Sequence, residues 1–274
     1  MKACFNTVTA GRHRPIEEII LWSSRAGFAA LEIDHVHIVD ALSRMPMNEL
    51  KKRIADAGLD VASIMAFNLA PLDDPEPGIA RIEEAARHAR GLGAPLLLVY
   101  CATNVPEEMS AEEALGRAAE RTAEYAEIAA PIAIGLEPIG RTTLMGGPAA
   151  ALKTAEKSGK SNVGIVIDTF HFHLSQISES ELRSIPRDKL LLVHVNDAED
   201  LPLEELGDEH RLHTGRGVLP LVLLLQTLKE MGYDHYLSVE IFREEYWRQP
   251  VQQVVMEAKH SLDAVLNEAS LTVL

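Results

Sequence analysis

The stretch N-V-G-I-V-I-D-T-F-H-F-H, from Asn162 to His173, is an apolar run that ends in a carboxylate, with two histidines just beyond. Residues 163–167 are all apolar or small, a pattern that predicts a parallel-sheet strand buried on both faces. Asp168 ends this strand, where an isolated carboxylate would be costly to bury. We therefore expect Asp168 to be paired with a cation, together with similar residues at the ends of other strands.

Strand-like and helix-like segments alternate along the whole chain. The expected strands are 2–6, 29–33, 61–67, 95–100, 132–137, 163–168, 189–195 and 236–241. The expected helices are 15–26, 47–57, 79–91, 110–130, 148–157, 179–184, 219–231 and 251–267. Eight strand–helix units in 274 residues predict an α/β fold, a (β/α)8 TIM barrel that forms a single domain over residues 1–274. An open doubly wound sheet is the alternative, but no Gly-x-Gly-x-x-Gly follows the first strand.

The composition narrows the classes of partner. The chain has 41 acidic and 26 basic residues and a formal charge of −15, which disfavours binding to a nucleic-acid backbone. No segment approaches the ~18 apolar residues of a membrane span, and the start lacks the pattern of a signal peptide. Cys4 and Cys101 lie in strand-like runs, as expected for buried free thiols in a reducing compartment. We expect a cytoplasmic protein that binds a small molecule, as a single chain or a homo-oligomer.

Each of the last four expected strands ends in, or just short of, a residue that can bind a metal. These residues are Glu137, Asp168, His194 and Glu240. Residues two positions before them should share their face and point into the barrel, whereas the residues between are large and aliphatic, as expected under the helices. Carboxylates clustered at the carboxyl rim would repel one another unless a cation held them. The pattern predicts one divalent ion, with Mn²⁺ favoured and Zn²⁺, Co²⁺ or Mg²⁺ as alternatives; four separate ion pairs are the plain alternative.

These motifs resemble those of the xylose-isomerase-like TIM barrel superfamily of sugar isomerases and epimerases, and most closely those of the inosose (2-keto-myo-inositol) isomerases. The matching segments are K-A-C-F-N at the start, G-L-E-P-I-G at Glu137, V-G-I-V-I-D-T-F-H-F-H at Asp168 and His171, H-V-N-D-A-E-D at His194, D-E-H-R at Arg211 and S-V-E-I-F-R at Glu240. The resemblance implies that Glu137, Asp168, His194 and Glu240 bind the metal, while His171 and Arg211 contact substrate oxygens.

Three departures from related patterns bear on the substrate. From His213 to Gly217, shortly after Arg211, the chain reads H-T-G-R-G, where family members commonly have Pro-Gly-x-Gly. The ketohexose 3-epimerases carry a further glutamate shortly after the first ligand, where this chain has Arg141-Thr-Thr, which weakens a ketose 3-epimerase assignment. The apurinic endonucleases need extra histidines on the second and third strands, and segments 29–33 and 61–67 contain none.

The expected reaction is isomerisation or epimerisation of a keto-polyol or ketose by proton transfer through a metal-stabilised cis-enediolate. Glu137 and Glu240 are the candidate acid/base pair, and His171 could move a hydroxyl proton. Asn6 and Trp247 are further candidates for substrate contacts, although packing explains Trp247 at least as well. A lyase, either an inosose dehydratase or a 3-keto-glycoside eliminase, needs the same metal and base and stays open. A barrel that only binds sugar is disfavoured by the intact ligand set.

Overall fold

The computed structural model describes residues 1–271, apart from the side chain of Ala66. Eight parallel strands close into a barrel in the order β1-β10-β7-β6-β5-β4-β3-β2. The strands are β1 (Lys2–Asn6), β2 (Ala30–Asp34), β3 (Asp60–Asn68), β4 (Leu96–Cys101), β5 (Ala133–Pro138), β6 (Val163–Asp168), β7 (Leu190–Val195) and β10 (Tyr236–Val239). Each lies within two residues of its expected bounds, and the (β/α)8 barrel is confirmed. Glu240 lies one residue beyond the last strand rather than inside it.

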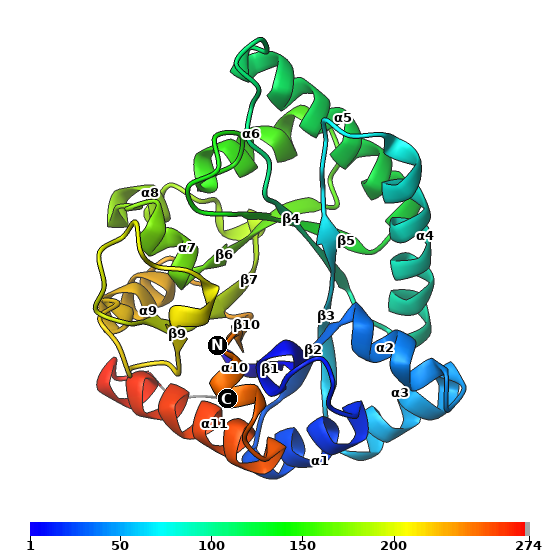
Figure 1. Ribbon diagram of the computed structural model, residues 1–274, viewed down its shortest axis with the longest axis vertical. Coiled ribbons are helices and arrows are strands. Elements are labelled where there is room, and N and C mark those ends of the chain that lie inside the picture. The colour runs from blue at the N-terminus through cyan, green and yellow to red at the C-terminus, as the bar shows by residue number, and fades with distance from the viewer. Residues whose placement is uncertain (272–274) are drawn as a thin grey trace.

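Helices surround the barrel as an outer ring (Figure 1). They are α1 (Ile16–Ala26), α3 (Met47–Asp56), α4 (Pro75–Leu92), α5 (Ala111–Ala129), α6 (Pro148–Lys157), α8 (Glu179–Arg183), α9 (Leu221–Glu230) and α11 (Val251–Glu268). The expected start of α4 at residue 79 is wrong, because Pro75 occupies the first turn and Asp74 accepts a hydrogen bond from the Glu76 amide. Proline is tolerated there, since the first amides of a helix have no partner within it. None of the helices in residues 1–271 is long and apolar enough to cross a membrane.

Short elements at the carboxyl rim were not expected from the periodicity. They are the helices α2 (His35–Leu42), α7 (Thr169–Leu174) and α10 (Glu244–Trp247), and the hairpin of β8 (Asp197–Ala198) and β9 (Arg211–Leu212). Two of the helices begin directly at an acidic strand end. The Asp34 carboxylate accepts a hydrogen bond from the Val36 amide, and Asp168 accepts from the amides of Phe170 and His171. An aspartate at the strand end thus serves as the N-cap of the next short helix.

Two separate apolar clusters confirm the predicted strand faces. Ile134, Leu136, Ile165 and Ile167 belong to the large cluster between strands and helices. The barrel interior holds a smaller cluster that includes Met65, Leu98, Val166 and Leu192. Gly135 faces this interior, since a Cβ atom there would lie 2.7 Å from Val166 Cγ2. The two cysteines are buried free thiols, as expected.

Candidate metal centre

The four strand-end residues singled out in the sequence meet at one point inside the carboxyl end of the barrel. Glu137, Asp168, His194 and Glu240 each offer one ligand atom, and these atoms all lie within 4.8 Å of one another. From His194 Nδ1, the distances are 3.0 Å to Glu137 Oε1, 3.2 Å to Glu240 Oε2 and 3.7 Å to Asp168 Oδ2. All four residues are buried. Three carboxylates and one buried imidazole nitrogen thus face a common position.

The other nitrogen of His194 faces a carboxylate that sequence reasoning missed. His194 Nε2 lies 2.9 Å from Glu32 Oε2, on the far side of the ring from the three acids. Glu32 is fully buried on β2 and accepts hydrogen bonds from Ser63 Oγ at 2.6 Å and Ser238 Oγ at 2.7 Å. When this carboxylate accepts a hydrogen bond from the Nε2–H group, the ring proton stays on Nε2 and the Nδ1 lone pair is free for a metal. The available signal was an acid at the centre of the apolar run A-L-E-I-D.

Arg211 reaches the same centre from the hairpin after β7. Its Nη1 lies 2.6 Å from Asp168 Oδ2 and 3.3 Å from Glu240 Oε2. The guanidinium lies over the rings of Phe170 and Phe242, at 4.9 and 5.4 Å from their centroids. Arg211 is only 1% exposed. It therefore pairs with two of the acids through its single positive charge, a contact that the sequence did not predict.

The remaining candidates occupy different places around this centre. His171 Nε2, on α7, lies 3.2 Å from Arg211 Nη2. Asn6 Nδ2 donates to Glu240 Oε1 at 3.0 Å. Asn196 was not singled out in the sequence, yet its side-chain amide donates to both oxygens of Asp168 at 3.2 Å.

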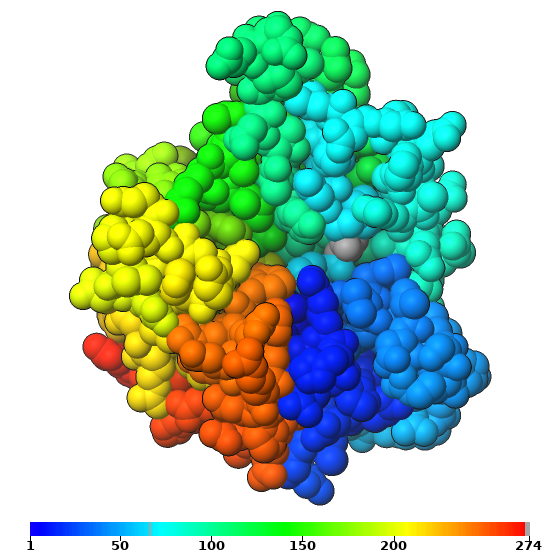
Figure 2. All heavy atoms as spheres, viewed as in Figure 1, coloured from blue at the N-terminus to red at the C-terminus, as the bar shows by residue number. Residues whose placement is uncertain are grey.

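A cavity of about 340 Å³ opens above the acids, within the size range of small-molecule sites. Its lining residues are Arg12, Met65, Tyr100, Ala102, Glu137, Ile139, His171, Asp208, Arg211, Glu240 and Phe242. Trp247 lies outside this lining, on α10 beside the inner apolar cluster, and its substrate contact stays a prediction. Figure 2 shows this end of the molecule, where the segment after β7 (yellow) and the segment after β10 (orange) lie side by side. Arg243 joins them through Glu199 at 2.6 Å.

Burial and neighbouring charges together shift the pKa values of the groups at this centre. Burial raises the pKa of Glu240 to about 8, and nearby Glu137 adds to the rise. Burial alone would also raise the pKa of Asp168, but Arg211 and the histidines lower it well below its ordinary value. The pKa of His194 is raised well above 6.5, because the surrounding glutamates outweigh its burial. Without a further cation, Glu240 thus holds a proton at neutral pH, whereas Asp168 stays ionised beside Arg211.

The sequence matches the family model described as xylose isomerase-like TIM barrel over residues 20–264. The chain belongs to this family. Among curated members, it is 26% identical to an inosose isomerase of Bacillus velezensis, over 98% of each chain. It is 27% identical to an inosose isomerase of Halalkalibacterium halodurans, over 98% of this chain and 97% of that one. More distant relatives are named L-ribulose 3-epimerase and 3-dehydroshikimate dehydratase.

Among solved structures, the barrel superposes on a crystal structure of the IOLI protein with a bound zinc atom. The TM-score is 0.90, with 24% identity over 98% of this chain and 99% of that one. This likeness supports the barrel fold. The resemblance inferred from the motifs is confirmed by the family match, and the expectation of an enzyme is confirmed by the names of its relatives.

Proposed function

We propose that this protein is a divalent-metal-dependent isomerase that acts on an unphosphorylated keto-polyol of the inosose class. The observation that carries the proposal is the convergence of Glu137, Asp168, His194 and Glu240 beneath a cavity of small-molecule size. Support for the substrate class comes from the two inosose isomerase relatives that match nearly the whole chain.

The donor set fits a divalent cation. A metal binds these groups with the acids ionised and His194 neutral. In that state the four carboxylates of Glu32, Glu137, Asp168 and Glu240 and the single positive charge of Arg211 leave a net charge of −3. A net negative charge buried to this degree calls for a further cation. Three carboxylates with one imidazole suit Mn²⁺ best, with Zn²⁺, Co²⁺ and Mg²⁺ as alternatives. When bound, such an ion would act as a Lewis acid on a substrate ketone and make the adjacent C–H more acidic.

The acid/base roles fall to the two glutamates that line the cavity. Glu137 Oε1 and Glu240 Oε2 both approach His194 Nδ1, at 3.0 and 3.2 Å. One would take the proton from the carbon beside the ketone, and the same or the other would return it to the neighbouring carbon. Asn6 donates to Glu240 Oε1 and so restrains the direction of that carboxylate.

His171 and Arg211 would contact the substrate's oxygen atoms, His171 by exchanging a proton and Arg211 by donating hydrogen bonds. Burial lowers the pKa of His171, so the imidazole is neutral at physiological pH and can both accept and donate a proton. Arg211 is held by Asp168 and by Asp208 at 2.9 Å, which fixes its fork of donors at the cavity wall. A donor held this rigidly positions a substrate oxygen without further ordering of its own side chain.

The decisive experiment follows inosose in D₂O with the metal-loaded chain, with Mg²⁺ or Zn²⁺ used for NMR because both are diamagnetic. We expect an isomeric keto-polyol that carries solvent deuterium at the carbon that receives the proton. Chelator-treated protein is the control and should give no product. Failure of every ion in the series to support conversion of any keto-polyol in a panel would refute the proposal.

A lyase is the second candidate, because distant relatives are named 3-dehydroshikimate dehydratase and elimination needs the same metal and base. The same experiment separates the two reactions. Product that has lost one water, or an expelled leaving group, would identify a lyase, whereas an isomer of unchanged composition identifies an isomerase.

A further inference from the structure

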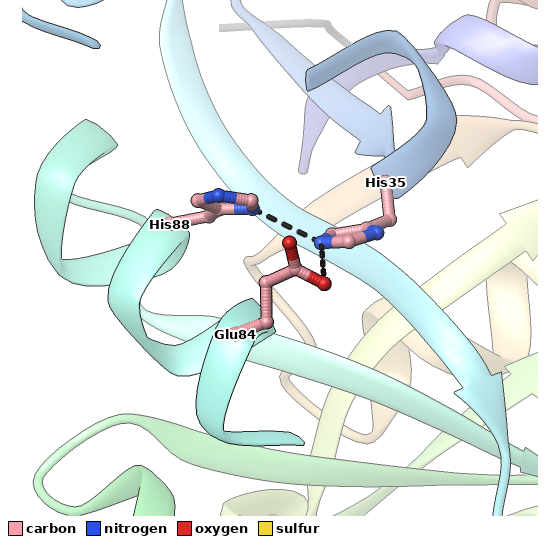
Figure 3. A group of neighbouring side chains, drawn as sticks. All are labelled: His35, Glu84 and His88. Carbon is pink, nitrogen blue, oxygen red and sulfur yellow. Dashed lines mark hydrogen bonds and ion pairs between the residues drawn. The ribbon is translucent and has the colours of Figure 1, made fainter. Parts of the chain in front are cut away.

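Three side chains form a second group of metal-ligand type outside the barrel centre. His35 is the first residue of α2, while Glu84 and His88 lie one turn apart on α4. Figure 3 shows the three side chains pointing toward one another across the gap between these helices. His35 Nε2 lies 3.0 Å from His88 Nδ1 and 4.0 Å from Glu84 Oε2. Their ligand atoms all lie within 4.8 Å of one another.

The backbone holds these side chains in place. Asp34 caps α2 through the Val36 amide at 2.9 Å, which fixes the first turn that carries His35. On α4, the neighbouring residues Ala85 and Ala89 are buried in the apolar layer around the barrel, so the helix cannot rotate. Residues four apart lie on the same helix face, and Glu84 and His88 therefore present their side chains together.

The distances are compatible with shared ligation, and the 3.0 Å between His35 Nε2 and His88 Nδ1 also lets the two rings share a hydrogen bond when no metal is bound. The 4.0 Å separation between Glu84 Oε2 and His35 Nε2 is too long for a hydrogen bond. Two ligand atoms at about 2.0–2.1 Å from one tetrahedral ion lie roughly 3.3 Å apart, and the separations of 3.0 and 4.0 Å bracket this value. Burial lowers the pKa of both His35 and His88, which keeps the imidazoles neutral and their lone pairs available.

We propose that His35, Glu84 and His88 form a second cation site that takes a zinc-class transition-metal ion and clips α2 to α4. Two imidazoles and one carboxylate match the three-ligand sets of zinc, with the remaining position open to water. The barrel centre offers one nitrogen and three carboxylates instead. Because imidazole-rich sets favour Zn²⁺ and oxygen-rich sets favour Mn²⁺ or Mg²⁺, the two sites should differ in metal preference.

The test counts zinc ions bound by the full, chelator-treated chain in equilibrium dialysis against Zn²⁺ alone. His88→Gln should bind one zinc fewer than the wild-type chain, and so should His35→Gln. Glu83→Gln is the matched control for Glu84→Gln, since both remove one charge from α4 and Glu83 lies outside the group. Glu83→Gln should keep the full count, and Glu84→Gln should weaken or lose one equivalent.

The readout is a difference between variants, so it does not depend on the barrel centre. Asp168→Asn, which perturbs the barrel centre, should leave the zinc that His88 binds in place. Circular dichroism and the isomerase assay check that the His88 and His35 variants remain folded. Equal zinc counts in wild type, His88→Gln and His35→Gln would overturn the proposal, as would an equal loss in Glu83→Gln and Glu84→Gln.

Discussion

Glu32→Gln tests whether the carboxylate behind His194 organises the barrel centre. Glutamine has the shape of glutamate and keeps one acceptor oxygen. With that oxygen in the place of Oε2, it still accepts from His194 Nε2 and Ser238 Oγ, and the Ser63 hydroxyl can turn to accept from the new amide. The substitution therefore removes the negative charge while preserving packing.

The expected cost follows from these contacts. Glu32 is 0% exposed, so its bond to His194 is not screened by water. Hydrogen bonds to charged groups contribute about 1.5–3 kcal/mol to stability and neutral ones about 0.5–1.5 kcal/mol. The exchange should therefore weaken the hydrogen bond between residue 32 and His194 by about 1–1.5 kcal/mol. Removal of the partner that orients a metal-binding histidine typically weakens metal binding by about 10- to 100-fold. We expect the Kd for Mn²⁺ to rise by at least the lower of these factors.

The assay is a competition titration of Mn²⁺ against a chromophoric chelator, because oxygen-rich ligand sets favour Mn²⁺ and the barrel centre is the site we propose for it. Glu49→Gln is the control, since it removes the same charge from an exposed position on α3, where Glu49 pairs with Arg53 at 2.9 Å. We expect wild-type affinity in the control. Unchanged Mn²⁺ affinity in folded Glu32→Gln would refute the role of Glu32, and an equal loss in both variants would point to net charge alone.

The remaining predictions concern turnover, pH and stability. Glu240→Gln should keep the circular dichroism spectrum but lower kcat by about 10²–10⁴-fold, because it removes an acid/base group; wild-type turnover would exclude Glu240 from the mechanism. The raised pKa of His194 means that its protonated form stabilises the metal-free fold fully below pH 6.5 and that this stability is lost as pH rises through the raised value. Metal competes with that proton, so metal affinity measured by titration should increase with pH over the same interval. Arg211→Lys should weaken Asp168 pairing, since lysine lacks the planar fork, and should raise KM in steady-state assays; an unchanged KM would argue against a substrate contact. Leu136→Ala, in the fully buried layer under the helices, should lower the free energy of unfolding by about 2–5 kcal/mol in urea titrations, and a loss below 1 kcal/mol would contradict the packing described.

Local patterns in the chain determined the barrel and the direction of its ligand face. The alternation of apolar strands with amphipathic helices repeats eight times, and strand parity placed Gly135, Val166 and Leu192 inside the barrel. The same parity pointed the four ligands inward. Their position at the strand ends placed them at one rim, because the carboxyl ends of parallel strands meet there. Each strand, helix and buried face is read from the residues of its own segment, and the barrel follows from their repetition.

Tertiary structure alone decided the contacts that complete the two groups of ligands. Glu32 meets His194 across 162 positions of sequence, and His35 meets His88 across 53. Arg211 reaches Asp168 because the loop after β7 folds back as a short hairpin, which no hydrophobic period encodes. A period tells which face of a strand or helix is buried, but it carries no information on which side chains from distant segments share that space. Their pairing follows from barrel closure and loop packing, and both depend on the whole chain at once.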